Sequence, residues 1–192
     1  METWLLPALL GVGLAASSGL RTFLPLLALA MAAKFHMFGI ELNAQFAWLG
    51  STVAVAALAL ATVIELIADK IPLVDHTLGL VGNVSRPLAG AVVAGAVFAR
   101  VDPATAVIAG LILGAPTAFA FHAAQAGTRG ASTATTAGVA NPILSVVEDV
   151  LAILTVMVAF VAPLLIPVML GLVLWAVWGL FRLIRRKLSG GA

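Results

Sequence analysis

Apolar residues form long runs along the chain, and most of the polar residues lie in the connections between them. A membrane-spanning helix needs roughly 20 apolar residues. We therefore expect spans at residues 4–33, 46–68, 86–100, 104–125, 142–162 and 164–184. The last two form one apolar run, which Pro163 and Pro167 divide into a hairpin. The pattern predicts an all-α membrane protein with a bundle of about six transmembrane helices, five being the alternative, in a single integral membrane domain (residues 1–192).

The composition agrees with this fold class. The chain is 62% hydrophobic and 9% charged, whereas soluble domains carry about 25% charged residues. The absence of cysteine excludes a disulfide framework, a thiolate metal site and a cysteine nucleophile. Four of the ten basic residues lie in the C-terminal sequence RLIRRK, which is typical of a membrane-flanking anchor and not of a nucleic-acid partner. Gly-x-Ser-x-Gly, HExxH and P-loop motifs are missing, so we expect no enzyme and no cofactor.

The distribution of basic residues predicts the orientation in the membrane. With six spans, the C-terminal cluster shares one side with Arg129, Arg86 and Lys70, and only Lys34 and Arg100 lie opposite. Lysine and arginine collect in cytoplasmic loops. We expect a multi-pass protein of the bacterial inner membrane with both termini in the cytoplasm.

An internal repeat is one interpretation of the chain. When the sequence is aligned with itself at a shift of 83 residues, VIELIAD matches VVEDVLA and Glu65 falls on Glu148. Two halves of three spans each would be inverted relative to one another, a common architecture of transporters with broken or re-entrant helices. The alternative is a bundle without internal symmetry. Small residues spaced four apart, such as Gly110 and Gly114, predict close helix packing and allow a homodimer.

Arg21 interrupts the first apolar run. An arginine at the centre of a bilayer costs about 2.5–3.5 kcal/mol on insertion scales, so its side chain should face protein, water or a partner. The flanking Ser17, Ser18, Gly19 and Pro25 predict a broken or kinked helix. Two interpretations stay open. Arg21 binds an anionic ligand, or it pairs permanently with an internal glutamate, for which Glu65 and Glu148 are the candidates.

Glu65 and Asp69 lie four residues apart and therefore share one helix face. Like charges in such a place raise the pKa of one group or require a cation, as in proton coupling. A divalent cation site that adds Asp75 and His76 is an alternative, and simple solvation of these residues at the membrane surface is another. The metal question stays open.

The segment GASTATTAGVANPILSVVED (residues 130–149) is unusually polar for this chain. We expect a flexible, partly re-entrant loop, followed by a helix that Asn141 caps and Pro142 begins. An ordinary polar loop is the alternative. Glu148 and Asp149 then fall in the second turn of that helix and are further candidates for proton or cation coupling.

Arg86 precedes Pro87 in NVSRP, where a second helix start is expected. Arginines beside helix starts suit carboxylates or phosphates, although they also serve as positive-inside anchors. The candidate ligand-binding residues are Arg21, Arg86, Arg129, Ser132, Thr133, Thr135, Thr136 and Asn141. His122 is expected to hydrogen-bond a neighbour, with a proton relay as the alternative.

Four strings in the chain, GLAASSGLRTFLPLLAL, ELIADKIPLVDH, RPLAGA and STATTAGVANPILSVVEDVLA, carry a resemblance. Together they resemble an uncharacterised family of small bacterial multi-pass membrane proteins, catalogued as domain of unknown function number 4126. The resemblance covers residues 5–185 or so and implies an inner-membrane setting, but no substrate and no ligand roles.

Three functions follow from these residues. The leading hypothesis is a small transporter or channel for a small solute or ion, in which arginine and hydroxyl groups hold an anion and the carboxylates carry protons or cations. The alternatives are a structural or assembly protein with static buried ion pairs, and a protein that binds membrane lipid.

Overall fold

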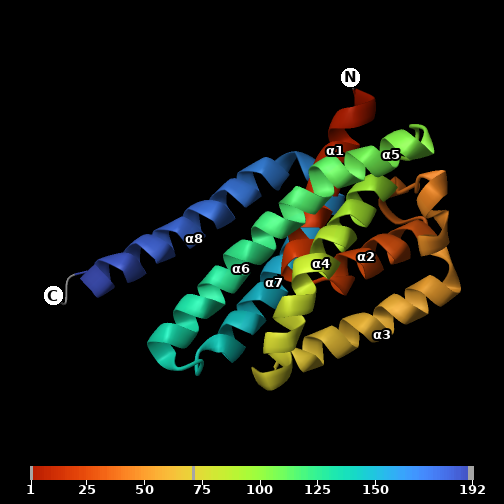
Figure 1. Ribbon diagram of the computed structural model, residues 1–192. Coiled ribbons are helices and arrows are strands. Elements are labelled where there is room, and N and C mark those ends of the chain that lie inside the picture. Colours follow the sequence, from red (N-terminus) through yellow and green to blue (C-terminus); the bar gives the residue numbers. More distant parts are fainter. Residues whose placement is uncertain (1, 71, 190–192) are drawn as a thin grey trace.

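The secondary structure of the described residues is helical, with no strands among them. A computed structural model describes the backbone of residues 2–70 and 72–189 (Figure 1). The α-helices are α1 (Glu2–Leu20), α2 (Phe23–Lys34), α3 (Thr52–Ala68), α4 (Pro72–Ala96), α5 (Pro103–Ala109), α6 (Ala115–Thr136), α7 (Asn141–Val161) and α8 (Ile166–Ser189). Shorter elements are η1 (Met37–Gly39), η2 (Ala44–Gly50), the π-helical η3 (Gly110–Gly114) and η4 (Pro163–Leu165). The described part does not include the side chains of residues 2, 3, 72–79 (with Asp75 and His76), 174, 176, 177, 180, 181 and 183–189.

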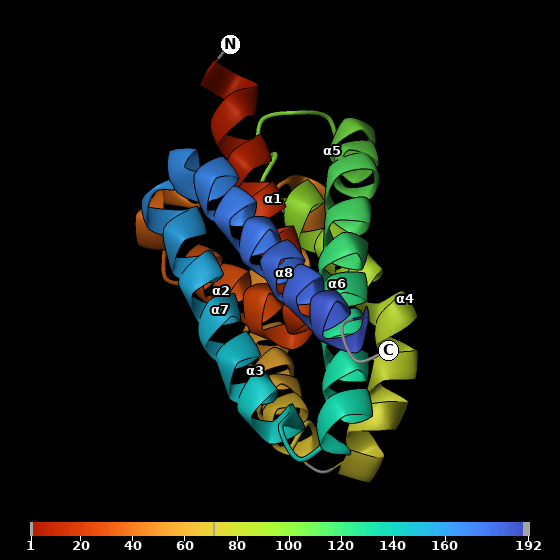
Figure 2. The ribbon, with the colours of Figure 1, turned by 90° about the vertical axis from the view of Figure 1, so that its left-hand side faces the viewer.

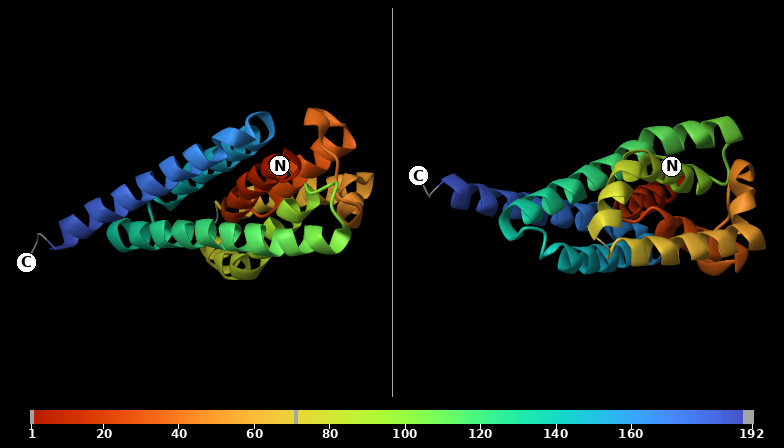
Figure 3. Two further views of the ribbon diagram at one scale, coloured as in Figure 1. Left: turned by 90° about the horizontal axis from the view of Figure 1, so that it is seen from above. Right: turned by 60° about the horizontal axis from the view of Figure 1, so that its bottom comes forward.

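Helix α1 lies in the middle of the bundle and packs against α4, α6 and α7 (Figures 2 and 3). Small residues allow this central position, because neighbouring helices approach closely where no large side chain intervenes. A Cβ atom on Gly13 would lie 2.9 Å from the Cβ of Ala159 in α7, and one on Gly11 would lie 3.1 Å from the Cα of Ala94 in α4. Ser17 and Ser18 of α1 are completely buried, so a polar stretch of the chain lies at the centre of the bundle.

The first apolar run is broken, as the sequence predicts. Helix α1 ends at Leu20, and α2 begins at Phe23 with a different direction (Figure 1). The break places Arg21 and Thr22 between two helix ends inside the bundle, where both are buried.

The predicted close packing at Gly110 and Gly114 is also confirmed. Helix α4 crosses η3 so closely that a Cβ on Gly90 would lie 2.7 Å from the carbonyl oxygen of Gly114. A Cβ on Gly95 would likewise lie 2.8 Å from the carbonyl oxygen of Ala106 in α5. The contact is therefore made by backbone against backbone, and it fixes α4 against the helix that runs through α5, η3 and α6.

Helix α5 begins at an acidic cap. Asp102 accepts a hydrogen bond from the backbone N–H of Thr105 (3.0 Å), as expected of an aspartate at this position. Hydrogen bonds from Thr105 lower the pKa of the exposed Asp102 carboxyl, so it is ionised when it caps the helix.

Two described helices are long and apolar enough to cross a membrane: the continuous helix Pro103–Thr136 and Asn141–Val161. Ala44–Gly50 and Thr52–Ala68, bent by 67° relative to each other, could form a third crossing. Large apolar side chains face outwards on these elements, among them Ile67, Ile112 and Met157, each more than half exposed. The all-helical fold is thus confirmed, whereas the number of six spans remains a prediction.

Two helix boundaries were wrong in the sequence interpretation. Helix α4 runs through NVSRP, with Pro87 inside it, so no helix begins at Arg86. Helix α6 extends to Thr136, so the expected flexible loop is reduced to a few residues around Gly138. Serine and threonine are compatible with this helix because their hydroxyls bond to carbonyls one turn back. Thr136 donates to the carbonyl of Ser132 (2.8 Å) in this way.

The start of α7 also differs from the expectation. Asn141 lies in the first turn of α7 and makes no capping hydrogen bond; its side-chain amide donates to Thr133 Oγ1 (3.0 Å) and so joins α7 to α6. The hairpin between α7 and α8 at Pro163 is confirmed (Figure 2). Glu65 lies in the last turn of α3 and Glu148 in the second turn of α7, so the proposed repeat does not place them at equivalent helical positions.

Candidate functional site

The polar side chains gather where four helix ends meet. Helices α3 and α6 end, and α4 and α7 begin, at the lower end of the molecule in Figure 1. The broken end of α1 points into the same region and carries Arg21. Residues far apart in the sequence therefore meet here, and we call this region the pocket end.

Arg21 is the largest completely buried side chain in the described part of the protein. Its Nη2 lies 2.7 Å from Asp69 Oδ2 at the end of α3, and its Nε donates to Asp149 Oδ1 of α7 at 2.5 Å. Nη2 also donates to the carbonyl and hydroxyl of Ser145, both at 3.1 Å. The expected pairing of Arg21 with Glu148 is present as a longer ion pair of 3.9 Å. The described contacts of Glu65 do not include Arg21, and the shorter ion pairs of Arg21, with Asp69 and Asp149, were not expected.

Arg129 of α6 forms a second bridge over the same carboxylates. Its Nη1 and Nη2 donate to the two oxygens of Asp69 at 3.0 and 2.9 Å, a bidentate geometry. Its Nε donates to Glu148 Oε1 at 3.1 Å, and its Nη2 also contacts Glu148 Oε2. Asp69 is 6% exposed and lies between two guanidinium groups, so simple solvation at the membrane surface is wrong for this residue.

Ser145 and Lys70 complete this ion-pair network. The Ser145 hydroxyl donates to Asp69 Oδ2 (2.5 Å), and Lys70 Nζ lies 2.6 Å from that hydroxyl and 2.7 Å from Asp149 Oδ2. The network contains the charged residues Arg21, Lys70, Asp69, Arg129, Glu148 and Asp149. The members that the structure describes are three cations and three carboxylates, so their formal charges balance, and they join α1, α3, α6 and α7.

Glu65 has a different environment. Its two carboxylate oxygens accept hydrogen bonds from the backbone N–H groups of Thr22 (2.7 Å) and Phe23 (3.0 Å). These groups open α2, so Glu65 supplies, from another helix, the anion that a helix N-terminus attracts. Glu65 is 7% exposed and makes no ion pair within the described part of the chain.

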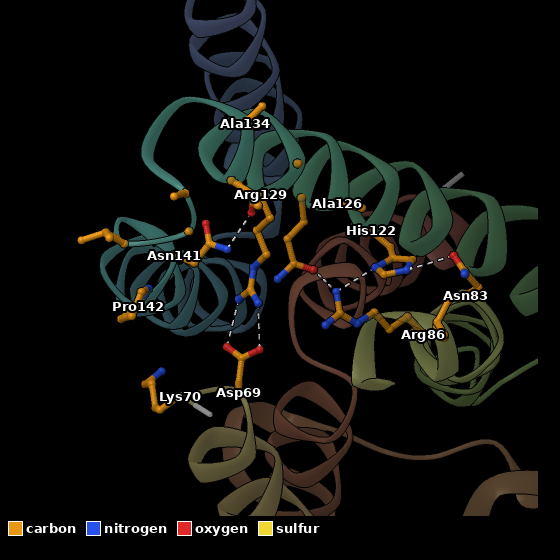
Figure 4. A pocket seen from close by; sticks show the side chains of 17 residues that line it. Asp69, Lys70, Asn83, Arg86, His122, Ala126, Arg129, Ala134, Asn141 and Pro142 are labelled. Atoms are coloured by element: carbon orange, nitrogen blue, oxygen red, sulfur yellow. Dashed lines mark hydrogen bonds and ion pairs between the residues drawn. The ribbon is translucent and has the colours of Figure 1, made fainter. Parts of the chain in front are cut away.

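Arg86 and His122 form a second polar group beside the network (Figure 4). Arg86 Nη1 donates to the carbonyl of Gly19 (2.9 Å) and lies 2.8 Å from His122 Nδ1. It also contacts Gln125 Oε1, while the Gln125 amide donates to Glu148 Oε2 (2.7 Å). Gln125 thus links Arg86 to the ion-pair network. His122 Nε2 lies 3.2 Å from Asn83 Oδ1, so the expected hydrogen bonding of His122 is confirmed.

A pocket of about 1030 Å³ opens beside these groups, between α4, α6 and the start of α7. Its polar lining comprises Asp69, Lys70, Asn83, Arg86, His122, Gln125, Arg129, Thr133 and Asn141. Small and apolar residues such as Leu80, Ala134 and Val139 form the rest of the lining. The volume suits a small-molecule ligand, and the named lining includes three cations against one carboxylate.

The candidate residues divide into three groups. Arg86, Arg129, Thr133 and Asn141 line the pocket, whereas Arg21 is enclosed in the network behind it. Ser132, Thr135 and Thr136 lie on the last turns of α6 but do not line the pocket, and the hydroxyls of Thr135 and Thr136 are bonded to their own helix.

A metal site gains no support from the described side chains. Among them, no group of three or more histidine, aspartate or glutamate residues is arranged to hold a metal ion. The candidate set with Glu65 and Asp69 also included Asp75 and His76, which lie outside the described part.

Ser145 and Gln125 were not singled out from the sequence as site residues. A signal for Ser145 was present, because Ser145, Glu148 and Asp149 follow the i, i+3, i+4 spacing of one helix face. For Gln125 the spacing from His122 (i, i+3) is a weaker signal, since Arg86, the residue that both contact, lies on another helix.

The chain belongs to the DUF4126 family. The family model, described as a domain of unknown function, matches residues 8–183, which confirms the resemblance noted in the sequence. No curated protein and no solved structure matches the chain.

Proposed function

We propose that this protein is an integral membrane protein of the bacterial inner membrane that moves a small anionic solute, as a transporter or channel, by way of the pocket. The outward apolar faces of the helices and the buried charges inside support the membrane setting, since charged residues in membrane proteins face the bundle interior or a water-filled cavity. On this proposal both termini lie in the cytoplasm.

One observation carries the choice of an anion: Arg86 is a buried cation that contacts no carboxylate among the residues that the structure describes. It is 5% exposed, and its described contacts are a carbonyl, an amide oxygen and an imidazole nitrogen. An isolated buried charge is costly, so an anionic ligand in the adjoining pocket would stabilise it. Lys70, whose side chain is 37% exposed, also lines this pocket, but Asp149 pairs with it, so Arg86 remains the cation that favours an anion.

The ion-pair network has a supporting role in this proposal. The charges of its described members neutralise one another, so these members contribute little attraction for a further ion. Asp69, Glu148 and Asp149 each already contact a cation. Of the four carboxylates considered for proton or cation coupling, Glu65 therefore remains the best candidate.

Flux into liposomes tests the proposal. The purified protein is reconstituted, and the uptake of sulfate, phosphate and simple carboxylates is followed together with membrane potential. We expect uptake of at least one of these anions, a loss of at least tenfold in Arg86→Gln and partial recovery in Arg86→Lys. Arg100→Gln is the matched control, because Arg100 is exposed and lies outside the pocket. Equal flux in Arg86→Gln and in the unaltered protein would exclude this site.

A structural role is the second candidate function, and a different observation favours it. The ion-pair network joins α1, α3, α6 and α7 through a completely buried arginine, an arrangement suited to holding a bundle together. A well-folded protein that moves none of the anions tested would favour this role.

A further inference from the structure

His122 and Arg86 are in direct contact inside the bundle. His122 is 4% exposed, and its Nδ1 lies 2.8 Å from Nη1 of Arg86. A guanidinium group has only donors, so His122 Nδ1 must be the acceptor and carries no proton. The remaining ring proton is then on Nε2, which lies 3.2 Å from Asn83 Oδ1 and donates to it. The contact therefore requires that His122 is neutral and carries its single ring proton on Nε2.

Protonation of His122 would change this contact from attraction to repulsion. With a proton on Nδ1, two cationic donors would face each other across 2.8 Å. The Arg86 group would still have the carbonyl of Gly19 and the side chain of Gln125 as acceptors. An oxyanion that accepts from both Nδ1–H and the guanidinium would remove the repulsion, because it would lie between two charge-assisted donors.

We propose that Arg86 and His122 together form a proton-linked oxyanion site, in which one proton binds His122 Nδ1 when a sulfate, phosphate or carboxylate group binds Arg86. The inference rests on the proposed function only for the location of the site, since it concerns binding and not flux. Linkage requires that the proton strengthens anion binding and that the anion strengthens proton binding by the same factor.

Other charges surround this pair on the helices packed against it. Among the described residues, the groups that act electrostatically on Arg86 are Glu65 of α3, Arg21 after the end of α1, Glu148 of α7 and Arg129 of α6. Three of them, Arg21, Glu148 and Arg129, are held in ion pairs with one another or with Asp69. Glu65 is bonded to the start of α2. Among the described residues in contact with Arg86, His122 is therefore the uncharged side chain that can gain a proton.

The pocket provides access for such an anion. Arg86 and His122 both line it, and Figure 4 shows the two side chains beside each other at its edge. Nε of Arg86 is buried and has no hydrogen-bond partner among the described residues, whereas Nη1 has three acceptors nearby. The free side of the guanidinium is therefore available to a ligand.

Binding of sulfate tests the inference, because sulfate keeps its charge between pH 5.5 and 8. The protein is placed in nanodiscs of neutral phosphatidylcholine, and sulfate binding is measured by calorimetry in buffers of different ionisation enthalpy. We expect uptake of close to one proton per sulfate, and an affinity that falls about tenfold per pH unit above the titration of the histidine. Binding without proton uptake would overturn the proposal. This measurement uses the unaltered protein, so it does not depend on the folding of a variant.

Two variants identify the group that takes up the proton. His122→Gln keeps an acceptor for Arg86 but cannot titrate, so we expect sulfate binding that no longer varies with pH. His36→Asn is the control, since His36 is exposed, has a positive φ that asparagine tolerates, and lies outside the pocket. A pH dependence that persists in a folded His122→Gln protein would contradict the assignment.

A third experiment distinguishes a lipid headgroup phosphate from a free anion as the ligand of this site. In nanodiscs with anionic phosphatidylglycerol, weaker sulfate binding to the unaltered protein would show that a lipid headgroup phosphate occupies the site. Unchanged binding would identify a free anion. Proton-linked binding without flux in liposomes would leave this site intact and overturn transport, whereas flux with proton-independent binding would overturn only the present inference.

Discussion

Arg21 shows how a single charged residue can be accommodated inside an apolar chain. It is completely buried, yet its described partners are the carboxylates of Asp69 and Asp149, the more distant Glu148 and a serine. Arginine suits this position because its planar group binds several oxygens at once. The residue that is most costly to place in a membrane thus becomes the centre of the contacts between α1, α3 and α7.

Removal of one partner from this network should destabilise the protein strongly. We expect Arg21→Met to lower the free energy of unfolding by about 3–5 kcal/mol, because it leaves buried carboxylates uncompensated. The double variant Arg21→Met, Asp149→Leu should recover part of this loss. Unfolding in detergent, followed by circular dichroism against denaturant, measures both effects.

The control for the double variant Arg21→Met, Asp149→Leu is the double variant Arg21→Met, Glu65→Gln. Glu65 contacts backbone N–H groups at the start of α2 and not Arg21, so its neutralisation should recover nothing. If this double variant were rescued and the Asp149 one were not, the pairing described for Arg21 would be wrong.

The comparison between sequence and structure is clearest for these charged residues. The sequence identifies Arg21, Glu65, Asp69 and Glu148 as anomalous, because charge in an apolar run must have a partner. It does not reveal which partner, since that depends on how helix ends meet. Glu65 accepts hydrogen bonds from backbone N–H groups that the break between α1 and α2 leaves unpaired. Backbone groups carry no sequence signal, so this partner of Glu65 could not be predicted from the residue types.

At the level of elements, close packing of α4 on η3 depends on glycine. Gly90→Ala should destabilise the protein by about 1–3 kcal/mol, since its Cβ would lie 2.7 Å from the carbonyl oxygen of Gly114 and the helices must separate. Gly171→Ala is a matched control, because nothing lies within 4 Å of a Cβ added there. The midpoints of thermal unfolding of the two variants decide the prediction, and equal midpoints would contradict it.

Helix α6 illustrates why element boundaries were harder to predict than element types. The sequence GASTATT has the composition of a loop, but the structure keeps it helical because Thr135 and Thr136 bond to carbonyls of their own helix. The break at Arg21 and the hairpin at Pro163 were predictable, since proline and a charge within an apolar run have strong local effects.

For the whole molecule, the absence of cysteine gives a direct test of topology. With six spans, Thr135 at the pocket end and Ala104 at the start of α5 should lie on opposite sides of the membrane. Both are exposed. We expect a membrane-impermeant maleimide to label Ala104→Cys from outside intact cells, and Thr135→Cys only in inverted vesicles. The unaltered protein should give no signal, and labelling of both positions from one side would contradict six spans.

The π-helical turn at Gly110–Gly114 has a consequence for the direction in which the pocket faces. The N–H of Ala115 bonds to the carbonyl of Gly110, five residues back, so this turn holds one residue more than an α-turn. Each residue of an α-helix advances the angular phase by about 100°. Deletion of Leu111 should therefore convert the π-turn into a regular α-turn and leave His122 facing α4. Deletion of Ala120 should instead rotate His122 away from α4 and abolish sulfate binding. The direction in which the polar side chains of α6 point is thus set by a helical turn that contains no polar side chain.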